Sequence, residues 1–289
     1  MVHDAGEAEI IGAYMQRYPQ RYAYRALATA AAARVFKRRG IRFSPLRGSA
    51  REVRSALRAY PRPDLVLLGT GDGPPVSWKY AAQCRERGIK TAGYLEHWVR
   101  YRERFGYPRA GWKKHLPDAL WVGDSYALRL ARRSFPGRRI KLVPNEYLRE
   151  VWREYKKKPA SRKPRLLYVS SASKDDCSVL EDTLTLVAKY RPDVPVRVRL
   201  HPQEREAAYR RLIARYAGKI DVRVTKNNDI LSDLRAARLV VGVETMALVV
   251  ALHCGKKTVS IMPGRARCPL PFRKIRKLRR VEKLRQFLK

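Results

Sequence analysis

A repeated alternation of short apolar runs and helix-forming segments restricts the fold of this chain more than any other feature. Residues 65–68, 166–169 and 239–243 are almost continuously apolar, and each run is followed by a loop and a helical segment. Such runs are typical of strands covered on both faces of a parallel sheet. The sequence therefore predicts an α/β fold made of doubly wound, Rossmann-like sheets.

The alternation pauses once, at residues 151–165, where lysine, arginine and proline give the composition of a linker. We therefore expect two Rossmann-like domains, residues 1–150 and 166–289, that face each other across a cleft. A single large α/β domain is the alternative. Near the start, residues 9–13 are predicted as a short strand and residues 22–38 as a helix.

The charge of the chain is far from ordinary. It has 64 Lys and Arg against 26 Asp and Glu, a formal net charge of +38, so its surface should attract nucleic acid, anionic lipid or phosphorylated substrates. There is no apolar run of membrane-spanning length, no signal-peptide pattern and no CxxC pair among four scattered cysteines. These patterns predict a reduced, cytoplasmic protein without a metal site.

Residues 273–289 are predicted to form a basic C-terminal helix. Its apolar face consists of Ile275, Leu278, Val281, Leu284 and Leu288. Two roles compete for this face: packing on the protein, or lying on an anionic membrane at the inner face of the cell. Packing is the favoured interpretation, because apolar faces of helices are more often turned to a core.

In the second half, His201 follows a predicted strand at residues 196–200 and precedes Pro202, which restricts its backbone. Arg199 lies two residues before it. An imidazole beside a guanidinium can hold a phosphate, or donate a proton to a leaving phosphate oxygen. The alternative is an ordinary histidine in a surface loop.

Two further strand exits in this half carry polar groups. Gly242 leads into Glu244 and Thr245 at a predicted helix start, where free N–H groups attract anions and a glutamate could bind ribose or sugar hydroxyls. A simple N-cap is the alternative, although glutamate is not a favoured cap residue. Ser170 and Ser171 form a hydroxyl-rich loop that fits a binding loop and an ordinary turn equally well.

In the first half, Glu96 and His97 stand at the exit of a strand predicted at residues 89–95, followed by Arg102. A carboxylate at that place could act as a base on an acceptor hydroxyl. An ion-paired loop is the alternative, because several arginines lie nearby. The glycine-rich segment at residues 69–73 matches neither a Walker loop nor GxGxxG, and so indicates nucleotide binding only weakly.

These motifs resemble GT-B glycosyltransferases, above all bacterial capsule and surface-polysaccharide enzymes with an HP motif. The likeness covers residues 199–204, 229–234 and 241–245 in the second half and residues 89–105 and 118–145 in the first. It implies that His201 contacts the phosphate of the donor, helped by Ser170, Ser171 and Thr245. Residues 1–150 would then serve the acceptor, and residues 166–289 the nucleotide donor.

The resemblance implies a metal-independent glycosyltransferase that moves a sugar, or a related phosphate-linked unit, from a nucleotide donor to a polyanionic or surface-glycan acceptor. His201 and Glu96 would be its catalytic residues, and it would need no cofactor beyond the nucleotide-activated sugar. A sugar-nucleotide epimerase or hydrolase on the same fold is the alternative among enzymes. A basic nucleic-acid-binding α/β protein is the alternative outside them, although the sequence contains no recognised nucleic-acid motif.

Overall fold

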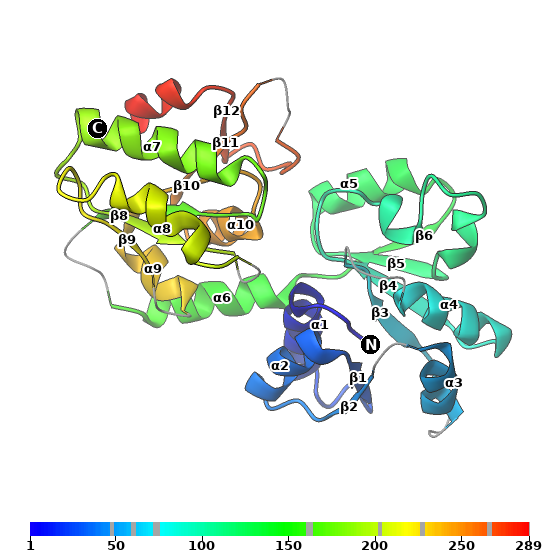
Figure 1. The fold of residues 1–289 in the computed structure, drawn as a ribbon. Helices are drawn as coiled ribbons and strands as arrows, with labels where there is room; N and C mark the ends of the chain where they lie inside the picture. The colour runs from blue at the N-terminus through cyan, green and yellow to red at the C-terminus, as the bar shows by residue number, and fades with distance from the viewer. Residues whose placement is uncertain are drawn as a thin grey trace. The chain divides into compact units, whose positions relative to one another are not determined.

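The computed structural model divides the chain into two compact units, Met1–Arg149 and Glu150–Lys289 (Figure 1). The first unit has two parallel sheets and the second has one, so the predicted α/β class is confirmed. The structure describes residues 1–46, 49–58, 62–71, 76–159, 164–201, 204–225, 229–264 and 268–288.

The first unit contains a two-stranded parallel sheet and a four-stranded parallel sheet in the order β3-β4-β5-β6. Its strands are β1 (Ala26–Ala28), β2 (Phe43–Pro45), β3 (Val66–Gly69), β4 (Thr91–Leu95), β5 (Ala119–Val122) and β6 (Arg139–Leu142). Residues 1 and 2 connect the two sheets. The N–H of Val2 donates to the carbonyl of Leu27 at 3.0 Å, and the N–H of Gly69 donates to that of Met1 at 2.9 Å. The opening residues thus act as a strand between β1 and β3.

The helices near the start of this unit differ from the predicted elements. They are α1 (Ala5–Arg17), α2 (Ala30–Arg38), α3 (Ala50–Arg58), α4 (Val76–Glu86), α5 (Ser125–Ser134), the start of α6 (Glu146–Lys157), and the 3-10 turns η1 (Glu103–Phe105) and η2 (Trp112–His115). The strand predicted at residues 9–13 is wrong, because Asp4 and Glu7 form a capping box that starts α1. The helix predicted at residues 22–38 begins only at Ala30, because β1 pairs with β2 and overrides local helix propensity.

The second unit contains a six-stranded parallel sheet in the order β12-β11-β10-β7-β8-β9. Its strands are β7 (Arg165–Val169), β8 (Val196–Arg199), β9 (Val222–Val224), β10 (Ala237–Gly242), β11 (Lys257–Ile261) and β12 (Arg276–Leu278). Its remaining helices are α7 (Asp176–Tyr190), α8 (Ala207–Ala214), α9 (Ile230–Ala236), α10 (Met246–His253) and the 3-10 helix η3 (Val281–Phe287). The strand order reverses between β7 and β10.

Part of the predicted linker is helical, and the boundary between the two units falls inside this helix. Residues 151–157 belong to α6, which begins in the first unit. Acid–base pairs one turn apart support the helix: Lys157 lies 2.7 Å from Glu154, and Arg149 lies 3.0 Å from Glu146. Residues 160–163 lie outside the described part of the chain.

The single C-terminal helix is also wrong, because residues 276–278 form β12 and residues 281–287 form η3. The interpretation that the apolar side chains pack on the protein is correct. All five are at most 9% exposed, and η3 lies beside α7. These side chains are Ile275, Leu278, Val281, Leu284 and Leu288. Among the helices that the structure describes, none has the length and apolar character needed to cross a bilayer.

Leu284→Ala should lower the free energy of unfolding by about 2–5 kcal/mol, because the side chain of Leu284 is completely buried. The neighbouring Lys283 is exposed, and Lys283→Ala should change it by less than about 0.5 kcal/mol. Urea denaturation of both variants checks this. Equal midpoints for the two would show that the C-terminal segment does not contribute to the core.

Candidate functional site

In the second unit, three neighbouring strands end in one row. Gly242 of β10 pairs with Val169 of β7, which pairs with Arg199 of β8. The chain leaves the sheet just after this row, at the edge where the strand order reverses and where open parallel sheets bind ligands. The predicted donor-site residues that follow the row are Ser170, Ser171, His201, Glu244 and Thr245.

The backbone at His201 is held by a small hydrogen-bond network. Its N–H donates to the hydroxyl of Ser170 at 2.7 Å and to the carboxylate of Glu204 at 3.0 Å. The hydroxyls of Ser170 and Tyr209 donate to the same carboxylate. Ser170 is 3% exposed, so its hydroxyl positions the His201 loop from inside the unit. Pro202 lies outside the described residues.

Burial lowers the pKa of the His201 imidazole below its ordinary value, while the carboxylates of Glu204 and Asp176 act in the opposite direction. His201 is therefore neutral at neutral pH. A neutral imidazole offers one N–H donor to a phosphate, and it gains a positive charge as the pH falls through its pKa.

Ser171 also shapes the loop after β7. Its N–H and its hydroxyl donate to one oxygen of Asp176 at 2.9 and 2.8 Å, and the N–H of Ser173 donates to the same oxygen at 2.8 Å. Tyr168 donates to the other oxygen at 3.1 Å. Asp176 is completely buried at the start of α7, so the serine-rich loop is wrapped around this carboxylate.

The turn after β10 presents the start of α10. Thr245 caps this helix, accepting from the N–H of Ala247 at 3.3 Å, and the first turn contains no acidic residue. Glu244 is half-buried just before the cap. A side chain at Gly242 would place its Cβ 2.4 Å from the carbonyl oxygen of Val169, so only glycine lets β10 approach β7 this closely. The free N–H groups at the start of α10 carry a partial positive charge. This start follows β10 and His201 follows β8, the two strands that flank β7.

Arg199 contributes to the structure of the unit rather than standing alone beside His201. Its guanidinium forms a 2.8 Å ion pair with Asp233 of α9. Arg197, two residues earlier in β8, forms a 2.9 Å ion pair with Asp221. Both arginines therefore share their charge with carboxylates on neighbouring elements.

In the first unit, Glu96 follows β4 and has a strongly perturbed environment. One oxygen lies 3.3 Å from Arg104, whose guanidinium also donates to the carbonyl of Thr70 at 2.6 Å. Among the described residues, no hydrogen-bond partner is found for the other oxygen. Burial, together with the charges of Asp4 and Glu7, raises the pKa of Glu96 well above its ordinary value.

The other two residues predicted here lie away from this carboxylate network. The ring of His97 lies 5.4 Å from that of Trp98, which donates to Asp124 at 2.8 Å. Arg102 donates to the carbonyl of Ser134 at 2.9 Å and so ties its loop to the end of α5. This hydrogen bond gives Arg102 a structural role in holding its loop.

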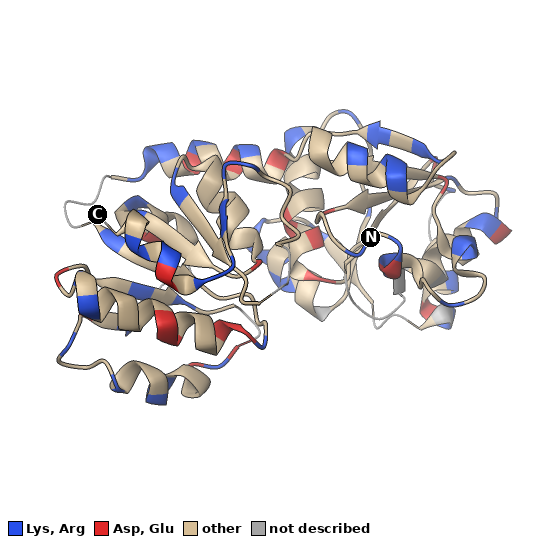
Figure 2. Ribbon diagram, turned by 90° about the horizontal axis from the view of Figure 1, so that it is seen from above, with Lys and Arg blue, Asp and Glu red and all other residues tan. Residues whose placement is uncertain are grey.

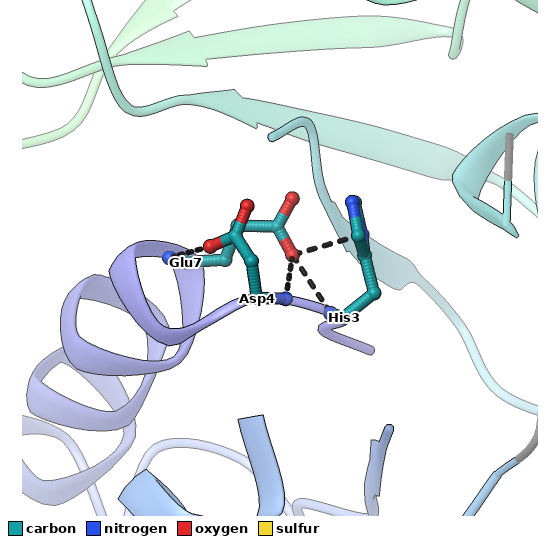
Figure 3. Close-up of side chains that lie close together, drawn as sticks. All are labelled: His3, Asp4 and Glu7. Carbon is teal, nitrogen blue, oxygen red and sulfur yellow. Dashed lines mark hydrogen bonds and ion pairs between the residues drawn. The ribbon is translucent and has the colours of Figure 1, made fainter. Parts of the chain in front are cut away.

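The structure adds an acidic cluster that sequence reasoning missed: Asp4, Glu7 and Glu96, with His3 and Arg104 beside them. Glu7 is 1% exposed, and one of its oxygens accepts from the backbone N–H groups of His3 at 2.8 Å and Asp4 at 3.3 Å (Figure 3). The ring of His3 lies 3.1 Å from the same oxygen. Since the opening residues lie between β1 and β3, the cluster occupies the point where strand order reverses in this unit.

The ionisable groups of the acidic cluster shift one another's pKa values. Burial and the charge of Glu7 raise the pKa of Asp4 to about 6. Burial opposes the ionisation of Glu7, but hydrogen bonding and the charge of His3 outweigh it and lower the pKa of Glu7. Burial alone would lower the pKa of His3, but the hydrogen bond to Glu7 and the charge of Glu7 outweigh it and raise this pKa. The cluster can therefore hold and release protons near neutral pH.

The glycine-rich segment after β3 makes room for this cluster. A Cβ at Gly69 would lie 2.1 Å from the carboxyl carbon of Glu7, and one at Gly71 would lie 1.6 Å from an oxygen of Asp4. The N–H of Gly71 donates to Glu7. These glycines therefore accommodate carboxylates, and residues 72–75 lie outside the described part. The Asp-x-x-Glu pattern of a capping box at residues 4–7 could have revealed the start of α1 from the sequence, but not the approach of Glu96.

No protein-family model matches the chain, and no curated protein sequence matches it significantly. Solved structures do match. UDP-GlcNAc 2-epimerase from Neisseria meningitidis bound to UDP-GlcNAc has a TM-score of 0.71 and 11% identity, covering 99% of this chain and 88% of that one. Anabaena HepE in complex with UDP and glucose has a TM-score of 0.65 and 12% identity over the same shares. MurG from Acinetobacter baumannii has 0.56 and 14%, also over those shares. The fold is that of GT-B enzymes.

Gly71→Ala should lower the free energy of unfolding by about 1–3 kcal/mol, because its Cβ would collide with Asp4. Adding Asp4→Ser, which keeps a good cap residue, should recover part of that loss. Gly242→Ala is the matched control: it collides with a backbone oxygen, so no side-chain truncation relieves it. Additive effects of Gly71→Ala and Asp4→Ser in chemical denaturation would contradict the packing described.

Proposed function

We propose that this protein binds a nucleotide sugar in its second unit and transfers the sugar to an acceptor hydroxyl. The observation that carries the proposal is the row of strand exits that brings His201 and the capped start of α10 to one edge of the sheet. The fold supports it, because two of the similar structures hold UDP-GlcNAc or UDP with glucose.

The diphosphate of the donor is proposed to lie between His201 and the start of α10. The N–H groups of a helix start and an imidazole N–H are suitable donors to phosphate oxygens. The carboxylate of Glu204 is near, but three donors already offset its charge: the Ser170 and Tyr209 hydroxyls and the His201 N–H. Glu244 is proposed to accept hydrogen bonds from hydroxyls of the ribose or sugar.

Glu96 is proposed as the base. In the transfer, the acceptor oxygen forms a bond to the anomeric carbon, the bond from that carbon to the diphosphate breaks, and the acceptor proton passes to the carboxylate. Burial raises the pKa of Glu96 well above that of an ordinary carboxyl, and a higher pKa makes its carboxylate a stronger proton acceptor. The leaving diphosphate takes up negative charge, which His201 and the start of α10 would stabilise.

A sugar-nucleotide epimerase or hydrolase is the second candidate. It is favoured by the presence of two carboxyl groups with raised pKa values, Asp4 and Glu96, because epimerisation must remove a proton and return one. Incubation with UDP-GlcNAc in D₂O without acceptor separates the reactions by NMR. Deuterium incorporation with a new epimer indicates epimerisation, and release of UDP indicates hydrolysis. A donor that stays intact until an acceptor is added indicates transfer.

His201→Ala should weaken binding of a UDP-sugar, and the loss should grow as the pH falls. The pKa of His201 lies below 6.5, so its imidazole gains charge only under acidic conditions, where it pairs more strongly with the diphosphate. Affinity of the wild type should therefore rise from about pH 8 to pH 5.5, and the affinity of the variant should stay flat. Calorimetry at several pH values measures both.

His253→Ala is the matched control, because His253 is exposed near the end of the same helix α10. It should bind the UDP-sugar as the wild type does. An unchanged affinity and pH profile in His201→Ala would rule out the donor site proposed here. If the wild type and both variants bound duplex DNA, and this binding collapsed at high salt, a nucleic-acid partner would be favoured.

Glu96→Gln should lower kcat by about 10²–10⁴-fold while leaving UDP-sugar affinity unchanged, because it removes the proton acceptor and leaves the second unit intact. Glu103→Gln, an exposed substitution in η1, should keep full turnover. Steady-state kinetics together with calorimetry checks both variants. Full turnover by Glu96→Gln would exclude Glu96 as the base.

A further inference from the structure

The start of α1 gathers the atoms of a metal site. One ligand atom from each of His3, Asp4 and Glu7 lies within 4.8 Å of the others. Figure 3 shows the three side chains next to one another, with a ring nitrogen of His3 and a carboxylate oxygen of both Asp4 and Glu7 on the same side. We propose that these three residues bind a divalent transition-metal ion.

The strongest support comes from the imidazole of His3. Its side chain is 7% exposed, and its Nδ1 lies 3.1 Å from the carboxylate of Glu7. Its Nε2 is buried, and the part of the chain that the structure describes offers it no hydrogen-bond partner. A buried polar atom without a partner is costly, and a metal ion would satisfy it. Histidines that bind metals usually have a carboxylate on their other ring nitrogen, as His3 has here.

Glu96 adds a second buried polar atom at the same place. A Cβ on Gly6, in the first turn of α1, would lie 3.1 Å from the Glu96 oxygen that lacks a partner among the described residues. The cluster then holds three carboxyl groups and one guanidinium, that of Arg104. A divalent cation would add positive charge among these carboxyl groups.

The ligand types narrow the choice of ion. Calcium and magnesium prefer oxygen ligands alone, whereas one imidazole nitrogen with two carboxylates suits Mn²⁺, Fe²⁺ or Zn²⁺. Mn²⁺ is the best probe, because it is paramagnetic and because it binds thiolates weakly, so the four free cysteines should not compete for it. The proposal concerns binding alone and does not depend on the proposed donor site in the second unit.

The test uses the full chain after treatment with a chelator. Mn²⁺ is titrated while the free ion is counted by electron paramagnetic resonance, and one ion should bind per chain. Asp4→Asn, which keeps a good helix cap, and His3→Gln should each weaken binding by more than about 100-fold. Glu9→Gln is the matched control: Glu9 lies on the same helix but pairs with Arg39 at 2.7 Å, and its removal should leave Mn²⁺ affinity unchanged.

Pulsed electron paramagnetic resonance on the Mn²⁺-loaded wild type adds a measurement that does not depend on whether a variant folds. It should show coupling to an imidazole nitrogen, and His3→Gln should abolish that coupling if it folds, as judged by circular dichroism. A wild type that binds no Mn²⁺ saturably, or binds it without nitrogen coupling, overturns the proposal. So does a His3→Gln or Asp4→Asn variant that keeps the affinity of the wild type.

Discussion

A buried carboxylate in the first turn of a helix organises the start of each unit. In the first unit, Glu7 of α1 accepts backbone N–H groups from His3, Asp4 and Gly71. In the second, Asp176 of α7 accepts those of Ser171 and Ser173. α7 follows β7, and α1 follows the opening residues that lie between β1 and β3. Because a buried carboxylate is stable only when donors surround it, the loops around Glu7 and Asp176 have little freedom to take another shape.

These buried acidic residues belong to a strongly basic protein. The chain has only 26 Asp and Glu, and several of them are buried or paired inside the units. Lys and Arg remain spread over the helices and strands of both units (Figure 2). Positive charge is therefore distributed over both units rather than confined to one of them.

The sequence was sufficient to predict the α/β class and the positions of the strand exits in the second unit. Continuous apolar runs such as residues 239–243 are typical of strands buried on both faces of a parallel sheet. It was misleading where tertiary pairing decides. Residues 26–28 look helical but pair with β2, and Leu278 looked like part of a helix but pairs with Ile261. Hydrogen bonds between side chains and loops were also out of reach, as with Ser170, Ser171 and Arg199.

The acidic cluster was missed for a different reason. Its members lie at residues 3–7, 96 and 104, so only the pairing of the opening residues with β3 brings them together. The capping box would have placed the helix start correctly, but not the approach of Glu96. Charge clusters built from distant segments depend on sheet order, which local patterns do not contain.

The close approach at Gly242 has a consequence for comparing this chain with its relatives. With a Cβ at that position, β10 would have to move away from Val169, and the loop that follows β7 would move with it. The residue at this one place in a related sequence is therefore a marker of where its serine loop lies. Sequence identity between this chain and structures that share its fold is only about a tenth. The loop geometry of this structure can be transferred to those related chains that have glycine at this position.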